Sequence, residues 1–418
     1  MTAQKYLKRN FTLNAIDGIT FIIGMMFLSM ESVLPVFLSK LGASHFVISL
    51  IPAVRNVGIF FPSIFVARRV QGQLRNKPWV LKSGLLQRLP WLFSGLFCYF
   101  FASDHPQAAI FSIMLAVFLA NLGGGITIPA FTYLTAKTIP VSLRGRLFAL
   151  RNLASYMLGF LAGLLINWIL KNLLFPQNFS VLMLIGFSFL MFYLPSFTLM
   201  VEPDASSEAP RNQKRKEFLE RLKKILRENR DLRNYIWGRV FFTLAFASYN
   251  FFAVFLVVKY DLPSSAVGTF TIITAGTYLI ANPLLGILSD RHGHLFNHFL
   301  GSAALILATL NIVFAHSYGI SLISIALGSF VLCVQSVSCF TLPMEFGEDH
   351  EIPIYVGLVG FFVGAASLLI IGFAWVAESF GYPVVFLICF VSAVISLFFF
   401  ARTTEPRGRK VWAIRDVR

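Results

Sequence analysis

The segment that decides the fold is residues 383–401, PVVFLICFVSAVISLFFFA. It has no charged side chain, and at about 1.5 Å per helical residue it is nearly as long as the hydrocarbon core of a bilayer is thick, about 30 Å. Lipid offers no hydrogen bonds, so a spanning segment satisfies its own backbone as a helix or within a closed barrel. Barrel strands alternate in polarity, whereas this segment is apolar almost throughout. It therefore predicts a membrane-spanning helix.

Similar apolar segments fill most of the chain. Of its 418 residues, 57% are hydrophobic and 13% are charged, and the mean hydropathy is +0.73. A soluble domain has about 25% charged residues, so the composition excludes an ordinary soluble enzyme. The sequence predicts an all-α membrane protein with twelve transmembrane helices in two six-helix bundles. The predicted spans are residues 11–38, 45–67, 79–101, 109–135, 147–170, 179–201, 234–259, 265–288, 296–316, 319–342, 353–377 and 383–401.

The connections between the predicted spans alternate in charge. The net charge is +16, and most basic residues lie at the two ends and in the even-numbered connections, as Arg68 and Arg69 do after span two. Cytoplasmic connections carry the excess of Lys and Arg, so both termini are predicted to be cytoplasmic, which requires an even number of spans. Basic connections also suit anionic cytoplasmic lipid. This distribution predicts a multi-pass protein of the plasma membrane with lipid as its partner, and it argues against nucleic acid.

The two halves of the chain share sequence features. The residues Asn14-Ala15-Ile16-Asp17-Gly18 open span one, and Asn234-Tyr235-Ile236-Trp237-Gly238 open span seven, 220 positions later. Internal repeats of this kind are expected of many secondary transporters. The sequence predicts an N-terminal half at 1–201, a cytoplasmic linker at 202–233, and a C-terminal half with a cytoplasmic tail at 234–418.

The predicted linker is highly charged, and apolar residues recur in it at helical spacing. This pattern predicts an amphipathic helix on the cytoplasmic face of the membrane. A solvated linker helix without lipid contact is the alternative. The apolar residues are Phe218, Leu219, Leu222, Ile225 and Leu226.

The connection after span eight carries a short signature. It reads Gly286-Ile287-Leu288-Ser289-Asp290-Arg291-His292-Gly293-His294-Leu295, and Pro140 with Arg144-Gly145-Arg146 follows span four. Both stretches resemble cytoplasmic loops of the major facilitator superfamily. Ala67 stands where the family usually has Asp after span two, and His294 replaces a usual Arg or Lys. The resemblance implies a transporter fold but leaves the substrate open, because fold does not specify function.

The resemblance also implies a cytoplasmic gate. Gly286 is expected to allow close helix approach, and Gly293 to allow a tight turn. Asp290 is expected to cap a neighbouring helix or pair with an Arg. The gate residues predicted in this way are Gly286, Asp290, Arg291, Gly293, Arg144 and Arg146.

Ionisable residues inside predicted spans are costly and are often functional. Asp17 and Glu31 lie 14 residues apart in span one, about four turns, which predicts a shared helix face. Spans one and two run antiparallel, and the depths of Glu31 and Arg55 differ by only about 5 Å. A carboxylate that binds and releases a nearby Arg could couple transport to protons, so Glu31, Asp17 and Arg55 are the coupling candidates. A fixed ion pair between two helices is the alternative for Glu31 and Arg55, and a helix-end contact is the alternative for Asp17.

Other polar residues in the spans are candidates for lining a substrate cavity. Arg88 and Arg239 could attract an anion, although such an Arg more often snorkels or pairs structurally. Each amide could instead form a hydrogen bond between helices. The predicted cavity residues are Asn56, Arg88, Asn121, Asn250, Asn282 and Gln335.

The sequence predicts no enzyme, cofactor or resident metal. The glycine-rich stretch of span four lacks the Gly-Lys-Ser/Thr ending of a phosphate-binding loop. The acidic connection 344–352 is predicted to be a cytoplasmic loop that faces the basic ones, and a metal site is the alternative. The four cysteines, Cys98, Cys333, Cys339 and Cys389, lie within apolar spans, where Cys behaves as a small hydrophobe.

These patterns together predict a secondary active transporter of a small molecule. Alternating access around a site near the bilayer midplane, between the two halves, is expected. Proton coupling is favoured because Asp17 and Glu31 are available, and the protein is predicted to act as a monomer. Two alternatives stay open: a receptor or assembly factor that has lost transport, and a flippase for lipids or other amphiphiles.

Overall fold

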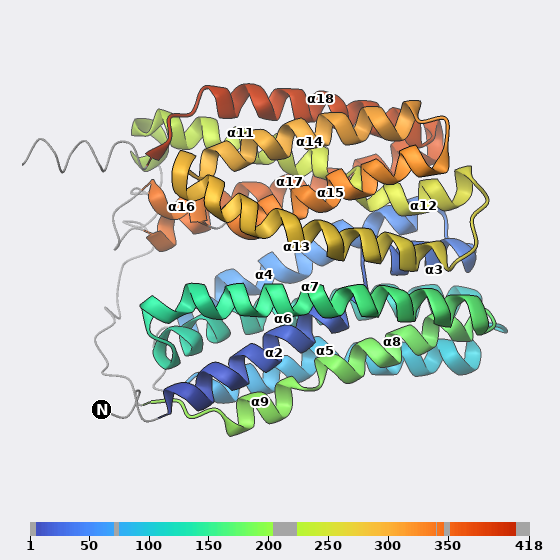
Figure 1. Cartoon of the computed structure of the whole chain (residues 1–418), viewed down its shortest axis with the longest axis horizontal. Coiled ribbons are helices and arrows are strands. Elements are labelled where there is room, and N and C mark those ends of the chain that lie inside the picture. Colours follow the sequence, from blue (N-terminus) through green and yellow to red (C-terminus); the bar gives the residue numbers. More distant parts are fainter. Residues whose placement is uncertain (1–5, 71–74, 204–223, 340, 347–351, 407–418) are drawn as a thin grey trace, which may run out of the picture. The chain divides into compact units, whose positions relative to one another are not determined.

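The computed structural model describes residues 6–70, 75–203, 224–339, 341–346 and 352–406. Within these residues the regular secondary structure is helical (Figure 1). The helices are α2 (Leu7–Phe27), α3 (Val33–Lys40), α4 (His45–Val70), α5 (Lys77–Phe101), α6 (Pro106–Thr138), α7 (Val141–Asn172), α8 (Gln177–Leu190), α9 (Tyr193–Leu199), α11 (Arg230–Phe246), α12 (Tyr249–Lys259), α13 (Ala266–His292), α14 (His294–Phe314), α15 (Tyr318–Ser338), α16 (Thr341–Glu345), α17 (Ile352–Phe380) and α18 (Tyr382–Ala401).

Described helix covers some part of every predicted span. Among the described residues, 10 helical segments are long and apolar enough to cross a membrane. The helices α4 and α5 are not among them, and α4 contributes only the shorter apolar stretch Phe46–Ile59. The all-helical membrane fold is therefore confirmed, whereas the number of twelve spans and the side on which the termini lie stay predictions.

The chain forms two compact units. The first comprises Met1–Arg211 and Val257–Ala275, and the second comprises Asn212–Leu256 and Gly276–Arg418. The start of α13 joins the first unit because it packs on α7, where Asn167 Nδ2 donates a 3.0 Å hydrogen bond to the carbonyl of Ser265. Most of the predicted amphipathic linker helix, from Phe218 to Leu222, lies outside the described residues, so that prediction is not tested.

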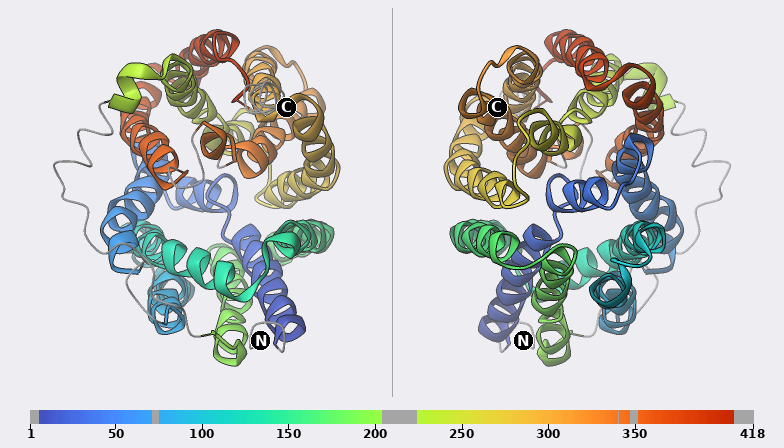
Figure 2. Two further views of the ribbon diagram at one scale, coloured as in Figure 1. Left: turned by 90° about the vertical axis from the view of Figure 1, so that its left-hand side faces the viewer. Right: turned by 90° about the vertical axis from the view of Figure 1, so that its right-hand side faces the viewer.

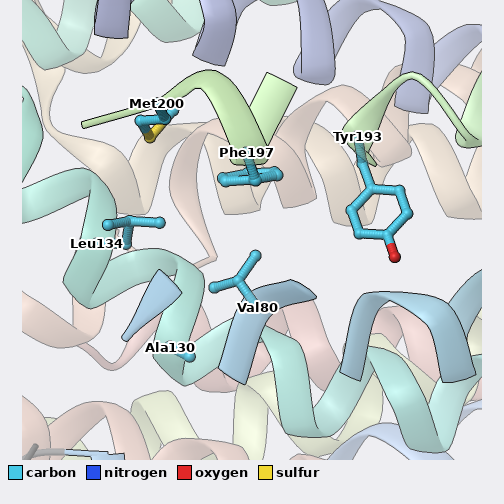
Figure 3. Packing of buried hydrophobic residues seen from close by; sticks show 6 residues of the cluster. All are labelled: Val80, Ala130, Leu134, Tyr193, Phe197 and Met200. Atoms are coloured by element: carbon cyan, nitrogen blue, oxygen red, sulfur yellow. The ribbon is translucent and has the colours of Figure 1, made fainter. Parts of the chain in front are cut away.

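In the first unit, α2 packs on α7 and α8, and α6 packs on α4 and α5 (Figure 2). Where α5 begins and α6 ends, a buried apolar cluster joins these helices to α9. Figure 3 shows the side chains of this cluster, which are Val80, Ala130, Leu134, Tyr193, Phe197 and Met200. In the second unit, α11 packs on α17 and α18, and α14 packs on α15 and α18.

Span one is interrupted, contrary to the prediction of one continuous helix over 11–38. The helix stops at Phe27 and resumes at Val33. The hydroxyl of Ser29 accepts hydrogen bonds from the backbone amides of Glu31 and Ser32, which competes with helical bonding. Pro35 has no amide hydrogen to give the carbonyl of Glu31. The shared helix face predicted for Asp17 and Glu31 is therefore wrong, because the helix between them is broken.

Span seven is interrupted at the corresponding place. α11 ends at Phe246 and α12 begins at Tyr249, and the gap lies 220 positions after the end of α2. The hydroxyl of Ser248 donates to the carbonyl of Ala245 at 2.8 Å, which gives the break a local hydrogen bond of its own. The two breaks therefore add a structural match to the sequence repeat.

Candidate functional site

Glu31 and Arg55 form an ion pair within the first unit. Glu31 lies in the break between α2 and α3, and Arg55 lies on α4 with Nη1 2.7 Å from Glu31 Oε1. The hydroxyl of Ser29 donates to the other carboxylate oxygen at 3.4 Å. The Arg55 side chain is 38% exposed and that of Glu31 is 19% exposed. The pair predicted to be within reach is thus formed, and part of it is exposed.

Asp17 belongs to a different cluster in the same unit. Its side chain is buried, and one oxygen, Oδ1, lies 3.8 Å from Arg88 Nη2 and has no hydrogen-bond partner. Arg151 of α7 also interacts electrostatically with this carboxylate. Asp17, Arg88 and Arg151 lie 10, 11 and 10 residues from the starts of α2, α5 and α7, so all three lie at about the same depth, about 15 Å from those helix ends. Asp17 is therefore not at a helix end.

Arg88 is held by several neighbours. Its Nε donates to the carbonyl of Leu190 at 2.8 Å, and Nη1 donates to the carbonyl of Gly84 and to Gln87 Oε1. The guanidinium carbon lies 3.8 Å from the centroid of the Tyr193 ring, which Figure 3 shows at the edge of the apolar cluster. These contacts leave little freedom for a ligand, so Arg88 is a structural residue in this conformation.

Arg151 was not among the residues singled out for transport, because its position resembled that of a loop charge at the start of span five. Its Nη1 donates to Asn14 Oδ1 at 2.8 Å, and both side chains are buried. A side chain at Gly18 would collide with the guanidinium of Arg151. The signal in the sequence is an ionisable residue four positions inside predicted span five.

The amide candidates have different surroundings. Asn121 Nδ2 donates to the carbonyl of Val117 on its own helix, and Asn250 Nδ2 donates to the carbonyl of Ala247. Asn282 Oδ1 accepts from Ser336 of α15, while its Nδ2 has no partner among the described residues. Gln335 and Asn56 are half-buried. Asn121 Nδ2 also contacts Met30 Sδ, in the break of span one, at 3.9 Å. The structure thus brings Asn282 next to α15 and Asn121 next to that break, and it gives Asn250 a local hydrogen bond.

The predicted gate residues are placed as follows. Gly293 turns the chain between α13 and α14 with a φ of +87°, as expected. Within the described part of the chain nothing lies within 4 Å of a Cβ at Gly286, so the close helix approach expected there stays a prediction. Asp290, Arg291 and Arg146 are exposed. The side chain of Arg144 lies outside the described residues.

The capping role expected of Asp290 falls to Glu405. The Glu405 carboxylate accepts from the amide of Leu295 in the first turn of α14, at 2.9 Å, and a Cβ at Gly293 would collide with it. In the first unit Glu202 does the same for α5, accepting from the amides of Asn76 and Lys77 at 2.8–3.0 Å. A carboxylate after the last helix of each unit therefore binds the start of that unit's third predicted span.

One residue of the acidic connection is half-buried and lies beside a histidine. The Glu345 side chain is 14% exposed, and its Oε1 lies 3.9 Å from Nε2 of the buried His294. Residues 347–351 lie outside the described part of the chain. Across the described residues, no three His, Cys, Asp or Glu side chains are grouped so as to hold a metal ion.

A family model described as the Major Facilitator Superfamily matches residues 16–275 and 238–416. The chain belongs to the major facilitator superfamily. The two matched ranges overlap between residues 238 and 275 and together reach into both predicted halves. The chain is therefore a multi-pass integral membrane protein of a transporter family, as the Gly286–Leu295 stretch suggested.

Solved major facilitator structures share this fold at low sequence identity. A crystal structure of a mutant of the nucleoside transporter NupG is 15% identical with a TM-score of 0.70, over 94% of this chain and 99% of that chain. A D-xylose–proton symporter is 14% identical with a TM-score of 0.68, over 96% and 99%. A bacterial homologue of the iron transporter ferroportin is 16% identical with a TM-score of 0.68, over 95% and 98%. No curated protein sequence matches the chain.

Proposed function

We propose that this protein is a proton-coupled secondary active transporter of a small molecule, working by alternating access, and that it is not an enzyme. The observation that carries the proposal is the partly exposed Glu31–Arg55 ion pair at the break in span one. Ionisable residues at membrane depth often form proton relays in transporters. One of the similar structures is named as a proton symporter, which supports the same class.

The pair suits a coupling step because it joins an irregular backbone segment to a neighbouring helix. With Glu31 ionised, its carboxylate holds Arg55 of α4 against the break. A proton on the carboxylate removes the negative charge, and the attraction for the guanidinium falls. The segment 28–32 and α4 can then move apart. A proton shifts such an equilibrium only by binding one conformation better than the other.

Asp17 is the second coupling candidate, and it differs from Glu31 in access. Its carboxylate is buried between helices, next to Arg88 and Arg151. In the conformation described here protons reach Glu31 more readily than Asp17. We therefore assign Glu31 the first protonation, and assign Asp17 a role only after α2, α5 and α7 have separated.

The test is proton movement in proteoliposomes. A ligand-stabilisation screen at several pH values first identifies a transported compound. A pH-sensitive dye then reports proton movement driven by a gradient of that compound. Glu31→Gln is expected to abolish substrate-driven proton movement while substrate exchange persists, because Gln keeps the shape and loses the titratable proton. The matched control is Glu378→Gln, which makes the same change at an exposed carboxylate near the end of α17.

Two other outcomes would favour the alternatives. Specific binding without flux of any compound would favour a receptor or assembly factor. Movement of labelled lipid between leaflets, with no solute flux, would favour a flippase. Unchanged proton movement in Glu31→Gln would remove Glu31 from the coupling step, and Asp17→Asn would then be the variant to examine.

A further inference from the structure

We infer that Arg239 binds the negative charge of the substrate, and that the substrate is a solute bearing a carboxylate or phosphate group. This inference rests on the proposed transport function and adds the substrate class to it. It is based on a buried guanidinium in the second unit, two of whose three nitrogens have no hydrogen-bond partner among the described residues.

Arg239 lies on α11 and is only 7% exposed. Neither Nε nor Nη1 has a hydrogen-bond partner among the described residues. Its nearest described aromatic contact is the ring of Phe242, whose centroid lies 5.5 Å from the guanidinium carbon. A planar guanidinium presents its N–H groups as a fork that matches a carboxylate or phosphate. The unused donors therefore fit an oxyanion that binds at this residue.

Buried arginines of the first unit show what a structural arginine looks like in this protein. Arg88 donates to two carbonyls and a side-chain amide, and Arg151 donates to Asn14. Both also face Asp17. Arg239 has no such set of acceptors among the described residues, although it is about as buried. A purely structural role would be expected to provide acceptors, because an unpaired buried charge is strongly unfavourable.

Two acidic residues act on the same tyrosine, Tyr235, as Arg239 does. Glu345 Oε1 lies against His294, and Glu405 Oε2 accepts from the amide of Leu295. The neighbouring His298 turns Nδ1 toward the carbonyl of His294 at 3.0 Å and Nε2 toward the hydroxyl of Tyr235 at 3.3 Å. None of these groups accepts a hydrogen bond from Nε or Nη1 of Arg239, and an anionic solute would.

Arg239 lies in the cytoplasmic half of predicted span seven. It lies nine residues after the start of α11 and five residues inside the predicted span 234–259, which is about 7.5 Å along the helix from the start of that span. Two turns further along, the helix is interrupted at Ala247–Ser248. Transporters of this kind bind substrates near the midplane and beside interrupted helices.

The first measurement needs no knowledge of the substrate. Thermal unfolding of the purified protein, without added anion, is compared for Arg239→Met and Arg88→Met. Arg239→Met is expected to leave the unfolding midpoint unchanged or raise it, because it removes an unpaired buried charge. Arg88→Met is expected to lower it. Arg230→Met, an exposed arginine on the same helix, controls for loss of one positive charge. A fall with Arg239→Met as large as that with Arg88→Met would overturn the inference.

The second measurement adds probes at constant ionic strength, with sodium chloride as reference. Inorganic phosphate and succinate test the two oxyanions, and glucose tests a neutral solute. At least one oxyanion is expected to raise the midpoint of the wild-type protein, and glucose is not. Arg239→Lys, which keeps the charge but loses the fork, is expected to weaken the apparent affinity about tenfold or more. The inference would be contradicted if neither oxyanion stabilised the wild-type protein, or if an oxyanion stabilised the wild-type and Arg239→Lys proteins equally.

A third arm separates a free solute from a lipid headgroup. The same measurement is made in detergent alone and with added phosphatidylglycerol. If only the lipid stabilises the protein, and Arg239→Met loses this effect, the ligand of Arg239 would be a lipid headgroup and not a transported solute. Failure of this inference is distinguishable from failure of proton coupling, because anion binding is measured without a proton gradient. Glu31→Gln is expected to keep the anion-dependent stabilisation.

Discussion

At the residue scale, the chain places charge inside its helices in different surroundings. Asp17 has two guanidinium groups near it and one unpartnered oxygen. Glu31 has one guanidinium near it and is partly exposed. The residues around Asp17 come from three helices, α2, α5 and α7, whereas the Glu31–Arg55 pair joins one helix, α4, to the turn after α2. This difference in support is why we assign the exposed pair, rather than the buried cluster, to the first protonation.

A substitution at Gly18 tests how closely the buried cluster is packed. In Gly18→Ala the new Cβ would overlap the guanidinium of Arg151, pushing it from Asn14. Overpacking of this kind costs about 1–3 kcal/mol, so a clearly lower thermal unfolding midpoint is expected. Gly357→Ala is the control, since nothing lies within 4 Å of a Cβ there. Similar midpoints for both variants would mean that Arg151 is not held where the structure places it.

At the scale of elements, the two units use the same device to hold a helix start. The dipeptides Glu202-Pro203 and Glu405-Pro406 each follow the last helix of a unit. Their carboxylates bind free backbone amides at the starts of α5 and α14. A negative charge at a helix N-terminus is favourable both as a hydrogen-bond acceptor and through the helix dipole. In the first unit Lys137 of α6 joins the same carboxylate at 3.2 Å.

Removing either carboxylate is expected to destabilise its own unit. Glu202→Ala and Glu405→Ala each leave amides without an acceptor, at a cost of about 1–2 kcal/mol. The larger effect is expected for Glu202, which binds two amides and a lysine. Glu228→Ala, at an exposed position, serves as control. Thermal unfolding measures the effect, and no difference among the three variants would show that the caps contribute nothing.

The sequence predicted helices where apolar blocks lie, but not their interruptions. Hydropathy averages over a window, so a turn bonded through Ser29 or Ser248 does not change it. The Glu31–Arg55 pair was predictable, because one short connection and a fixed rise per residue set both depths. The cluster of Asp17, Arg88 and Arg151 was not, since it depends on how three non-adjacent helices rotate. For the same reason the role given to Asp290 fell to Glu405, which is distant in sequence.

At the scale of the whole molecule, the repeat appears in three features. The sequence offset of 220 residues relates the starts of spans one and seven, and their interruptions follow the same offset. A Glu-Pro cap follows the last helix of each predicted half. The orientation of the chain in the membrane is predicted from the charge of its connections.

Labelling of single introduced cysteines tests that orientation. Asp104 lies in a predicted outer connection and Asp290 beside a predicted cytoplasmic one, and both are exposed. The four native cysteines are buried, so the unaltered chain is the background control. A membrane-impermeant maleimide is expected to label Asp104→Cys in intact cells, and Asp290→Cys only after the membrane is opened. The reverse result would invert the topology. Labelling of both variants in intact cells would require an even number of spans between them, where five are predicted, and would reject the assignment of twelve.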